Sequence, residues 1–174
     1  MKQTTTVVNE IDISISPEMV FDLVSSPGLW PRWHPSSRHL APGADRPLKK
    51  GETFSEEIKA GGREGKLQWI VTECDRPRLW VATASSDQGV TIQLKYETEK
   101  NLAGAHFKRT LNYTMTSPFL ILANTIFMRF KIRRESAHAL GNLKQLLEKG
   151  VSSDVVQWKC AMPLHSLSLH NRDS

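Results

Sequence analysis

The stretch SPFLILANTIFMRFKIRRESAHALGNLKQLLEKG, residues 117–150, decides how the rest of the chain must fold. Ser117 suits the cap position before a helix, Pro118 suits the first helical position, and Gly150 suits the position just after a helix end. The stretch therefore predicts one helix of about thirty residues, which at about 1.5 Å per residue is a rod of about 45 Å.

Projected at about 100° per residue, this helix is amphipathic. Its stripe consists of residues without polar side chains at helical spacing: Phe119, Leu122, Ala123, Ile126, Phe130, Ala137, Leu140 and Gly141. Lys131 and Glu135 fall on the opposite side. A helix of this kind must bury its stripe against a large apolar surface, which the preceding residues have to supply.

The residues before the helix predict strands joined by short turns. Residues 4–15 end in alternating isoleucines, which indicates a half-buried strand, and Ser16 and Pro17 then start a short helix. A second short helical segment is expected over residues 29–33. From residue 38 to residue 115, period-two alternation between Gly, Pro and Asn turns indicates an antiparallel meander of about six strands. Only the long helix is large enough to cover this sheet, so the predicted fold class is α+β.

Composition excludes several classes of protein. A chain of 174 residues with 39% hydrophobic residues suffices for one domain with a core and is too short to expect two. The net charge of +5 permits an anionic partner, but 23 basic residues are scattered among 18 acidic ones, so we expect no nucleic-acid partner. The one dense basic group, Arg129, Lys131, Arg133 and Arg134, is expected to solvate the helix edge.

The sequence also lacks the patterns of cofactor and metal sites. Cys74 and Cys160 have no partners at zinc-binding spacing, and no phosphate loop, dinucleotide motif or catalytic triad is present. We therefore expect no cofactor and no metal. The first residues contain no uninterrupted apolar region, and the longest apolar run, residues 119–130, is too short to span a bilayer. These features predict a cytoplasmic protein with reduced thiols and no integral membrane segment.

The end of the chain differs from the rest. Residues 151–174 show no helical or strand period and finish in polar residues. We expect one domain over residues 1–150, followed by a poorly ordered tail over residues 151–174.

Five short motifs, in order along residues 5–149, resemble those of START-like, polyketide cyclase/dehydrase-type (SRPBCC) domains. The motifs are IDISISPEMVFDLV at 11–24, WPRWHP at 30–35, PLKKGETF at 47–54, WIVTECDRP at 69–77 and ALGNLKQLLE at 139–148. The resemblance implies a helix-grip fold (START-like, Bet v 1-like), in which a curved antiparallel sheet and two short helices accompany a long C-terminal helix over a hydrophobic cavity. It implies no single activity, because the family includes lipid carriers, hormone receptors, cyclases and hydrolase-regulating proteins.

A cavity between a sheet and a helix suits an apolar ligand with one or two polar handles. The candidate ligand-binding residues lie on inward positions of strands and helices, or in the segment that flanks the pocket in this family. They are Trp33, His34, Phe54, Trp69, Tyr96, Arg109, Tyr113, Ile126, Phe130 and Arg133.

Arg109 is the most informative of these residues, because it shares the inward parity of Phe107 and Leu111. A buried guanidinium needs an acceptor, which is either a protein carboxylate such as Glu56 or an anionic ligand. Arg133 falls inside the predicted helix stripe, so it marks the mouth of the cavity or reaches to water from the helix edge.

The other polar candidates also allow two interpretations each. His34 is a general base or a loop histidine without a role, since no Ser, Cys or Asp partner is fixed by sequence. Tyr96 points its phenol inward, which requires a partner and suggests a hydrogen bond to a ligand. Trp69 lines a pocket or packs in the core. No residue is assigned a catalytic role.

These features favour a non-catalytic protein that binds a small hydrophobic molecule, such as a lipid or a polyketide-like compound. The first alternative is a polyketide cyclase or aromatase, in which Arg109, Tyr96 or His34 orients and enolises the chain. Such an enzyme needs inward polar residues that converge on one point of the cavity. The second alternative is a regulator with a closed cavity that binds a partner through its surface.

Overall fold

The computed structural model describes residues 2–40, 42–60, 63–86, 89–123 and 128–150. Its strands are β1 (Gln3–Ile13), β2 (Ser37–Leu40), β3 (Thr53–Ala60), β4 (Arg63–Asp75), β5 (Leu79–Ser85), β6 (Val90–Asn101) and β7 (Gly104–Met115). Its helices are α1 (Pro17–Val24), the 3-10 helix η1 (Pro27–Arg32), α2 (Pro118–Ala123) and α3 (Arg129–Gly150). None of the described helices is long and apolar enough to cross a membrane.

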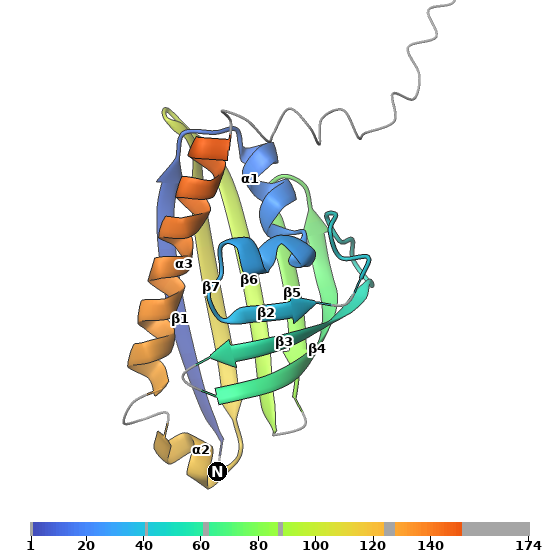
Figure 1. Ribbon diagram of the computed structural model, residues 1–174, viewed down its shortest axis with the longest axis vertical. Coiled ribbons are helices and arrows are strands. Elements are labelled where there is room, and N and C mark those ends of the chain that lie inside the picture. Colours follow the sequence, from blue (N-terminus) through green and yellow to red (C-terminus); the bar gives the residue numbers. More distant parts are fainter. Residues whose placement is uncertain (1, 41, 61–62, 87–88, 124–127, 151–174) are drawn as a thin grey trace, which may run out of the picture.

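The strands form one seven-stranded antiparallel sheet in the order β1-β7-β6-β5-β4-β3-β2. The sheet curls, so that β2, β3 and β4 cross in front of the long strands, and α3 lies along β1 inside the curve (Figure 1). This arrangement confirms the helix-grip prediction. The predicted strand parity also holds, because Phe107, Arg109 and Tyr113 are all buried on one face of β7.

The predicted single helix over residues 117–150 is wrong. The structure contains two helices, and Figure 1 shows α2 beyond the lower end of the sheet at an angle to α3. Ile121 of α2 packs on a separate apolar cluster that includes Val7, Tyr113 and Met115. The short helix therefore caps one end of the sheet instead of extending the face of α3. Residues 124–127, between the helices, lie outside the described residues.

Most of the predicted helix stripe is wrong for the same reason, although its member Leu140 is buried as expected. Phe119, Leu122 and Phe130 are 66%, 61% and 59% exposed, and Ala137 is also exposed. The buried face of α3 is formed by side chains at helical spacing: Ser136, Ala139, Leu140, Leu143 and Leu147. A stripe projected from residue 119 treats α2 and α3 as one straight rod, although the two helices lie at an angle to each other (Figure 1). The predicted phase is therefore rotated away from the buried face.

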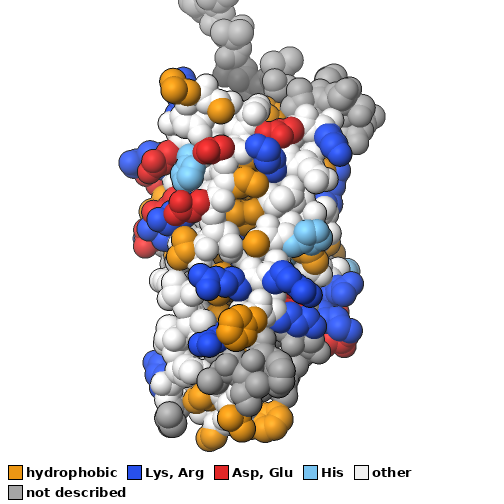
Figure 2. Space-filling view, turned by 90° about the vertical axis from the view of Figure 1, so that its left-hand side faces the viewer, with side chains coloured by type: hydrophobic (Ala, Val, Ile, Leu, Met, Phe, Trp, Pro, Cys, Tyr) orange, Lys and Arg blue, Asp and Glu red, His pale blue; other side chains and the backbone are white. Residues whose placement is uncertain are grey.

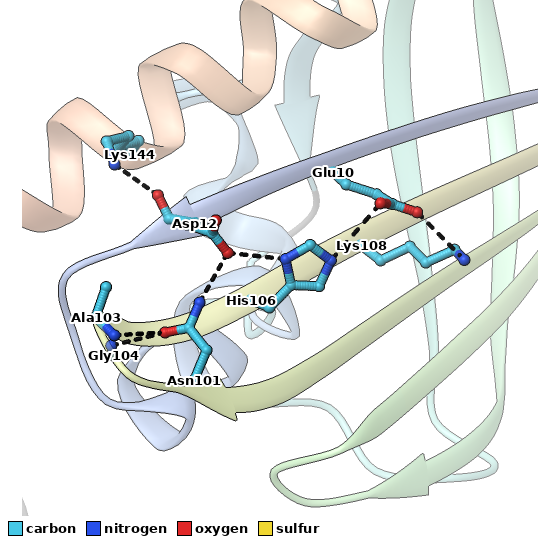
Figure 3. A network of polar contacts seen from close by, with 8 residues as sticks. All are labelled: Glu10, Asp12, Asn101, Ala103, Gly104, His106, Lys108 and Lys144. Atoms are coloured by element: carbon cyan, nitrogen blue, oxygen red, sulfur yellow. Dashed lines mark hydrogen bonds and ion pairs between the residues drawn. The ribbon is translucent and has the colours of Figure 1, made fainter.

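The C-terminal half of α3 is tied to the sheet by a polar network at the end opposite α2 (Figure 3). Lys144 donates from Nζ to the Asp12 carbonyl oxygen at 2.5 Å. The Asp12 carboxylate lies 2.8 Å from both Asn101 Nδ2 and His106 Nδ1. In addition, Asn142 of α3 donates to the Trp33 carbonyl oxygen at 3.2 Å. These contacts hold α3 in one position above the concave face of the sheet.

The core next to η1 is built from aromatic rings around Trp30. Its indole meets the rings of Phe54, Trp69, Trp80 and Tyr96 edge-on, with centroid distances of 5.5 to 6.3 Å. The Trp30 Nε1 group donates to the Val24 carbonyl oxygen at 2.8 Å, so the buried indole nitrogen is satisfied. This cluster closes one side of the space between the sheet and α3.

Candidate ligand-binding cavity

A cavity of about 80 Å³ lies between the concave face of the sheet and α3. Its wall combines aromatic, aliphatic and polar side chains from the sheet, η1, the segment before β2, and α3. The lining residues are Trp30, His34, Ser36, Glu56, Ile58, Leu67, Trp69, Ile92, Leu94, Tyr96, Arg109, Leu111, Ile132, Glu135 and Ser136. The mixed lining fits the predicted combination of an apolar pocket with a few polar handles.

Arg109 on β7 supplies the positive charge of the cavity, and its side chain is only 4% exposed. Its Nη1 donates to Ser136 Oγ at 2.5 Å, and its Nη2 lies 3.1 Å from His34 Nε2. Its Nε is buried and has no hydrogen-bond partner in the described part of the chain. Among the described residues the guanidinium contacts a hydroxyl and an imidazole and has no direct ion pair with a carboxylate.

Glu56 on β3 is the acid that sequence reasoning offered as a partner for Arg109. Within the described residues, no ion pair joins the two side chains, and Glu56 instead accepts a hydrogen bond of 2.9 Å from Trp69 Nε1. Burial raises the pKa of Glu56 to about 7, against the lowering effects of its hydrogen bonds and of the Arg109 charge. Near neutral pH this carboxyl group is therefore protonated in a large fraction of molecules and neutralises Arg109 poorly.

His34 and Tyr96 complete the polar end of the cavity. Burial and the nearby Arg109 charge lower the pKa of His34 well below its usual value, so its imidazole is neutral and Nε2 accepts from Arg109. Tyr96 pairs with Arg109 across β6 and β7. Burial raises the pKa of Tyr96, so the phenol keeps its proton and serves as a donor. A neutral imidazole that accepts from Arg109, a neutral phenol and one cation thus face the same space.

The arrangement favours recognition of an oxygen anion over nucleophilic chemistry. Ser136 Oγ accepts from Arg109 and donates to the Asn9 amide oxygen at 2.6 Å. That hydroxyl is not activated, because its acceptor is an amide and not a base. Among the described residues, no cluster of three or more His, Cys, Asp or Glu side chains could hold a metal ion.

Glu56→Gln is expected to remove a pH dependence of stability between about pH 4.5 and about pH 7. The folded protein holds the Glu56 proton in this window while the unfolded chain has released it, so the free energy of unfolding falls as pH rises. The stability that the protonated Glu56 carboxyl contributes is fully present below about pH 4.5 and is lost as the pH rises through about 7. The total fall is about 3 kcal/mol at most. Urea unfolding at several pH values across this window measures how steeply the free energy of unfolding falls with pH.

The neighbouring Glu57→Gln variant is the matched control, because Lys66 pairs with Glu57 and lowers its pKa below the window. The free energy of unfolding of this control should fall with pH as it does in the unmodified protein. An unchanged slope in Glu56→Gln would contradict the role given to Glu56.

Four of the residues expected to bind a ligand line the cavity together, namely His34, Trp69, Tyr96 and Arg109. Two others lie directly behind this wall. Trp33 is 1% exposed and packs against His34 and Tyr96, whereas the ring of Phe54 stacks on Trp69 at 5.7 Å. These two buried residues support the lining side chains and do not line the cavity themselves.

The remaining candidates lie elsewhere. Tyr113 is buried in the second apolar cluster, beneath α2. Phe130 is exposed, so its expected inward orientation is wrong. Arg133 is exposed as well, which agrees with a side chain that reaches to water from the helix edge. Ile126 lies outside the described residues.

Sequence reasoning missed Ser136 and Ile132 and placed Glu135 on the opposite side of the helix, whereas all three line the cavity from α3. A usable signal was present at the other end of the helix. Counting backward from Leu147 in steps of three and four residues passes through Leu143 and Leu140 to Ser136 and Ile132. The C-terminal part of the helix therefore predicts the buried face correctly, whereas the N-terminal part does not.

Comparison with known families identifies the group of proteins to which the chain belongs. The family model described as "Polyketide cyclase / dehydrase and lipid transport" matches residues 4–148. The chain belongs to this family. The matched range includes residues of all seven strands and nearly all of α3.

Curated relatives in sequence are distant. Two uncharacterised mycobacterial proteins, Rv2574 of Mycobacterium tuberculosis and Mb2604 of Mycobacterium bovis, are each 30% identical to the chain over 63 residues. The matched segment is 35% of this chain and 38% of each relative. The match thus spans well under half the length of either protein.

Solved structures show the same fold at low identity. A protein from Rhodobacter sphaeroides has a TM-score of 0.61 at 15% identity, covering 83% of this chain and 93% of that one. Ara h 8.0201 has a TM-score of 0.58 at 12% identity, covering 84% and 99%. The di-domain ARO/CYC protein BexL, of the BE-7585A biosynthetic pathway, has a TM-score of 0.61 at 13% identity, covering 82% and 49%. At these identities the likeness extends to the fold alone.

Proposed function

We propose that this protein binds a small, largely apolar molecule that carries one carboxylate or enolate oxygen, with that oxygen at Arg109. The observation that supports the proposal is a buried guanidinium without a carboxylate partner and with an unpartnered Nε. Burial of an uncompensated charge is costly unless a ligand supplies the opposite charge. His34, Tyr96 and Arg109 serve as the polar anchor, and Trp69 and the aliphatic lining residues contact the apolar body.

The size of the cavity limits the ligand. A volume of about 80 Å³ is well below the roughly 300 to 1,000 Å³ of most ligand pockets. A lipid or a polyketide chain therefore requires the N-terminal half of α3 to move away from the sheet. Ser36 donates to Glu135 Oε2 at 3.1 Å, which links the segment before β2 to this half of α3. Such a movement breaks this part-buried hydrogen bond and those that join Ser136 to Arg109 and Asn9, a cost that the apolar area buried by a ligand has to offset.

The proposal is tested with chemically matched ligands. Medium-chain fatty acids and aromatic carboxylic acids, each compared with its methyl ester, are titrated into the full chain while the unfolding temperature is followed. Acids should raise the unfolding temperature by mass action, and their esters should raise it less, because only the acids carry the anion that Arg109 needs. Equal shifts for acids and esters, or no shift for either, would overturn the proposal.

A cyclase or aromatase is the second candidate, because His34, Tyr96 and Arg109 converge on one cavity as that activity requires. In such a reaction an enolate carbon attacks a carbonyl of the same chain, a carbon–carbon bond forms and water leaves. Tyr96 and Arg109 would stabilise the developing oxyanions. Mass spectrometry of a poly-β-ketone substrate after incubation separates the candidates. A cyclase releases a product lighter by one water, whereas a binding protein returns the substrate unchanged.

The compartment and the extent of the domain are part of the proposal. Cys74 is a free, partly buried thiol in the described part of the chain. A free thiol is compatible with a reducing compartment, so the proposal places the protein in the cytoplasm. The binding unit extends over residues 1–150. The tail over residues 151–174, expected to be poorly ordered, lies outside the described residues.

A further inference from the structure

An apolar surface is exposed where the chain passes from α2 to α3. Phe119 and Leu122 of α2 are 66% and 61% exposed, and Phe130 in the first turn of α3 is 59% exposed. Single exposed hydrophobic residues are normal on protein surfaces. Three large ones within a dozen residues of sequence form a group that calls for a physical reason, and we name them the apolar tip.

Four basic side chains lie beside the apolar tip. Arg129, Lys131, Arg133 and Arg134 of α3 are all exposed, and none forms an ion pair within the described residues. The sequence contains no Asp or Glu between Glu99 and Glu135. Figure 2 faces the side that α3 occupies and shows Lys and Arg side chains across the middle of this face, with hydrophobic side chains beside and below them. The acidic side chains on this face lie mostly higher.

The basic residues occupy a position that does not favour helix stability. The N-terminal end of a helix carries the positive end of its dipole, so cations there are unfavourable. The first turn of α3 contains no acidic residue that would offset them. The Arg129 guanidinium lies 4.7 Å from the centroid of the Phe130 ring, so basic and apolar groups are interleaved on one surface. Helix stability therefore does not account for this distribution of charge.

We propose that α2 and the N-terminal half of α3 bind the surface of an anionic membrane. The apolar tip would enter the boundary between headgroups and acyl chains, and the four cations would contact anionic headgroups. Each cation near such a surface contributes about 1 kcal/mol, and the apolar side chains add burial energy. The protein would lie on the membrane without spanning it.

The positive charge of this surface makes a second copy of the chain an unfavourable partner for it. Two copies meeting through the same surface would bring two sets of four unpaired cations together without acids to neutralise them. A nucleic acid would use the cations but would leave the aliphatic Leu122 without an apolar partner. An anionic bilayer supplies both the negative charge and the apolar medium. The proposal is independent of which ligand fills the cavity.

The test is flotation of the full chain with vesicles of phosphatidylcholine alone and of phosphatidylcholine mixed with phosphatidylglycerol. Binding is expected only to the anionic vesicles, and it should weaken as salt increases. The double variants Leu122→Ser/Phe130→Ser and Arg133→Glu/Arg134→Glu should each weaken the partition coefficient by about tenfold or more. Circular dichroism confirms that each variant is folded.

Matched controls carry the same chemical changes elsewhere. Ile70→Ser alters a hydrophobic residue that is 43% exposed on β4, and Lys49→Glu/Lys50→Glu reverses two exposed charges in the segment before β3. These controls should bind anionic vesicles as the unmodified protein does. The proposal is overturned if the unmodified protein does not bind anionic vesicles, or if the controls and the tip variants lose binding equally. It is also overturned if sedimentation shows that the tip variants only dissociate an oligomer.

Discussion

Replacing Arg109 by methionine is expected to abolish the preference for carboxylate ligands and to leave the free energy of unfolding unchanged or higher. The guanidinium is 4% exposed, contacts Ser136 and His34, and has no carboxylate partner among the described residues. Removing a buried charge that is not neutralised relieves a desolvation cost, and methionine fills most of the volume. Loss of charge-assisted hydrogen bonds to a ligand anion should weaken acid binding by about a hundredfold.

The measurements are calorimetric titration with an acid and its methyl ester, and urea unfolding. Ester binding should change little in Arg109→Met, whereas Arg109→Lys should keep part of the acid preference, because it keeps the charge without the planar fork. Arg78→Met is the matched control, since Arg78 lies at an exposed turn and pairs with Asp75. A loss of about 3 kcal/mol or more in Arg109→Met, with ligand selectivity intact, would show that Arg109 is a structural residue.

Replacing Trp30 by alanine is expected to lower the free energy of unfolding by about 3 to 5 kcal/mol, among the largest losses from a single substitution here. Trp30 is 3% exposed and meets four aromatic rings, so truncation leaves a cavity that rigid neighbours cannot fill. It also removes the hydrogen bond to the Val24 carbonyl oxygen. Differential scanning calorimetry should show a midpoint lower by about 10 °C for a domain of this size.

Two further variants are compared with Trp30→Ala for their loss in the free energy of unfolding. Trp30→Phe should cost less, because a ring remains against Phe54 and Trp69, although the Val24 carbonyl oxygen loses its donor. Ile70→Ala, at a side chain that is 43% exposed, should change the free energy of unfolding by about 0.5 kcal/mol or less. If Trp30→Ala cost no more than Ile70→Ala, the aromatic cluster would not be the packed centre inferred here.

Most of the fold followed from local patterns. Alternation along β6 and β7 placed Tyr96 and Arg109 on the inward face, and the structure pairs these two residues directly across the strands. Strand parity is predictable because side chains alternate with a period of exactly two residues, whatever the partner strand. Helix phase is less robust, because the projected stripe was centred on residues of α2, which lies at an angle to α3. Most stripe members on α3 therefore missed the buried face, although Leu140 did not. The residues nearest the C-terminal end, where α3 is continuous, keep the correct phase.

The sequence by itself determined the order of the strands, the inward side of each strand and the family, since all three depend on short-range patterns. Only the tertiary structure decided which inward residues meet. His34, Tyr96, Arg109 and Ser136 come from four separate segments, and only the curl of the sheet under α3 brings them to one cavity. The partner of Arg109 was likewise undecided, because two inward residues on β3 and β7 are separated by the three strands between them. Distances across a curved sheet depend on its curvature, which no local pattern in the chain encodes.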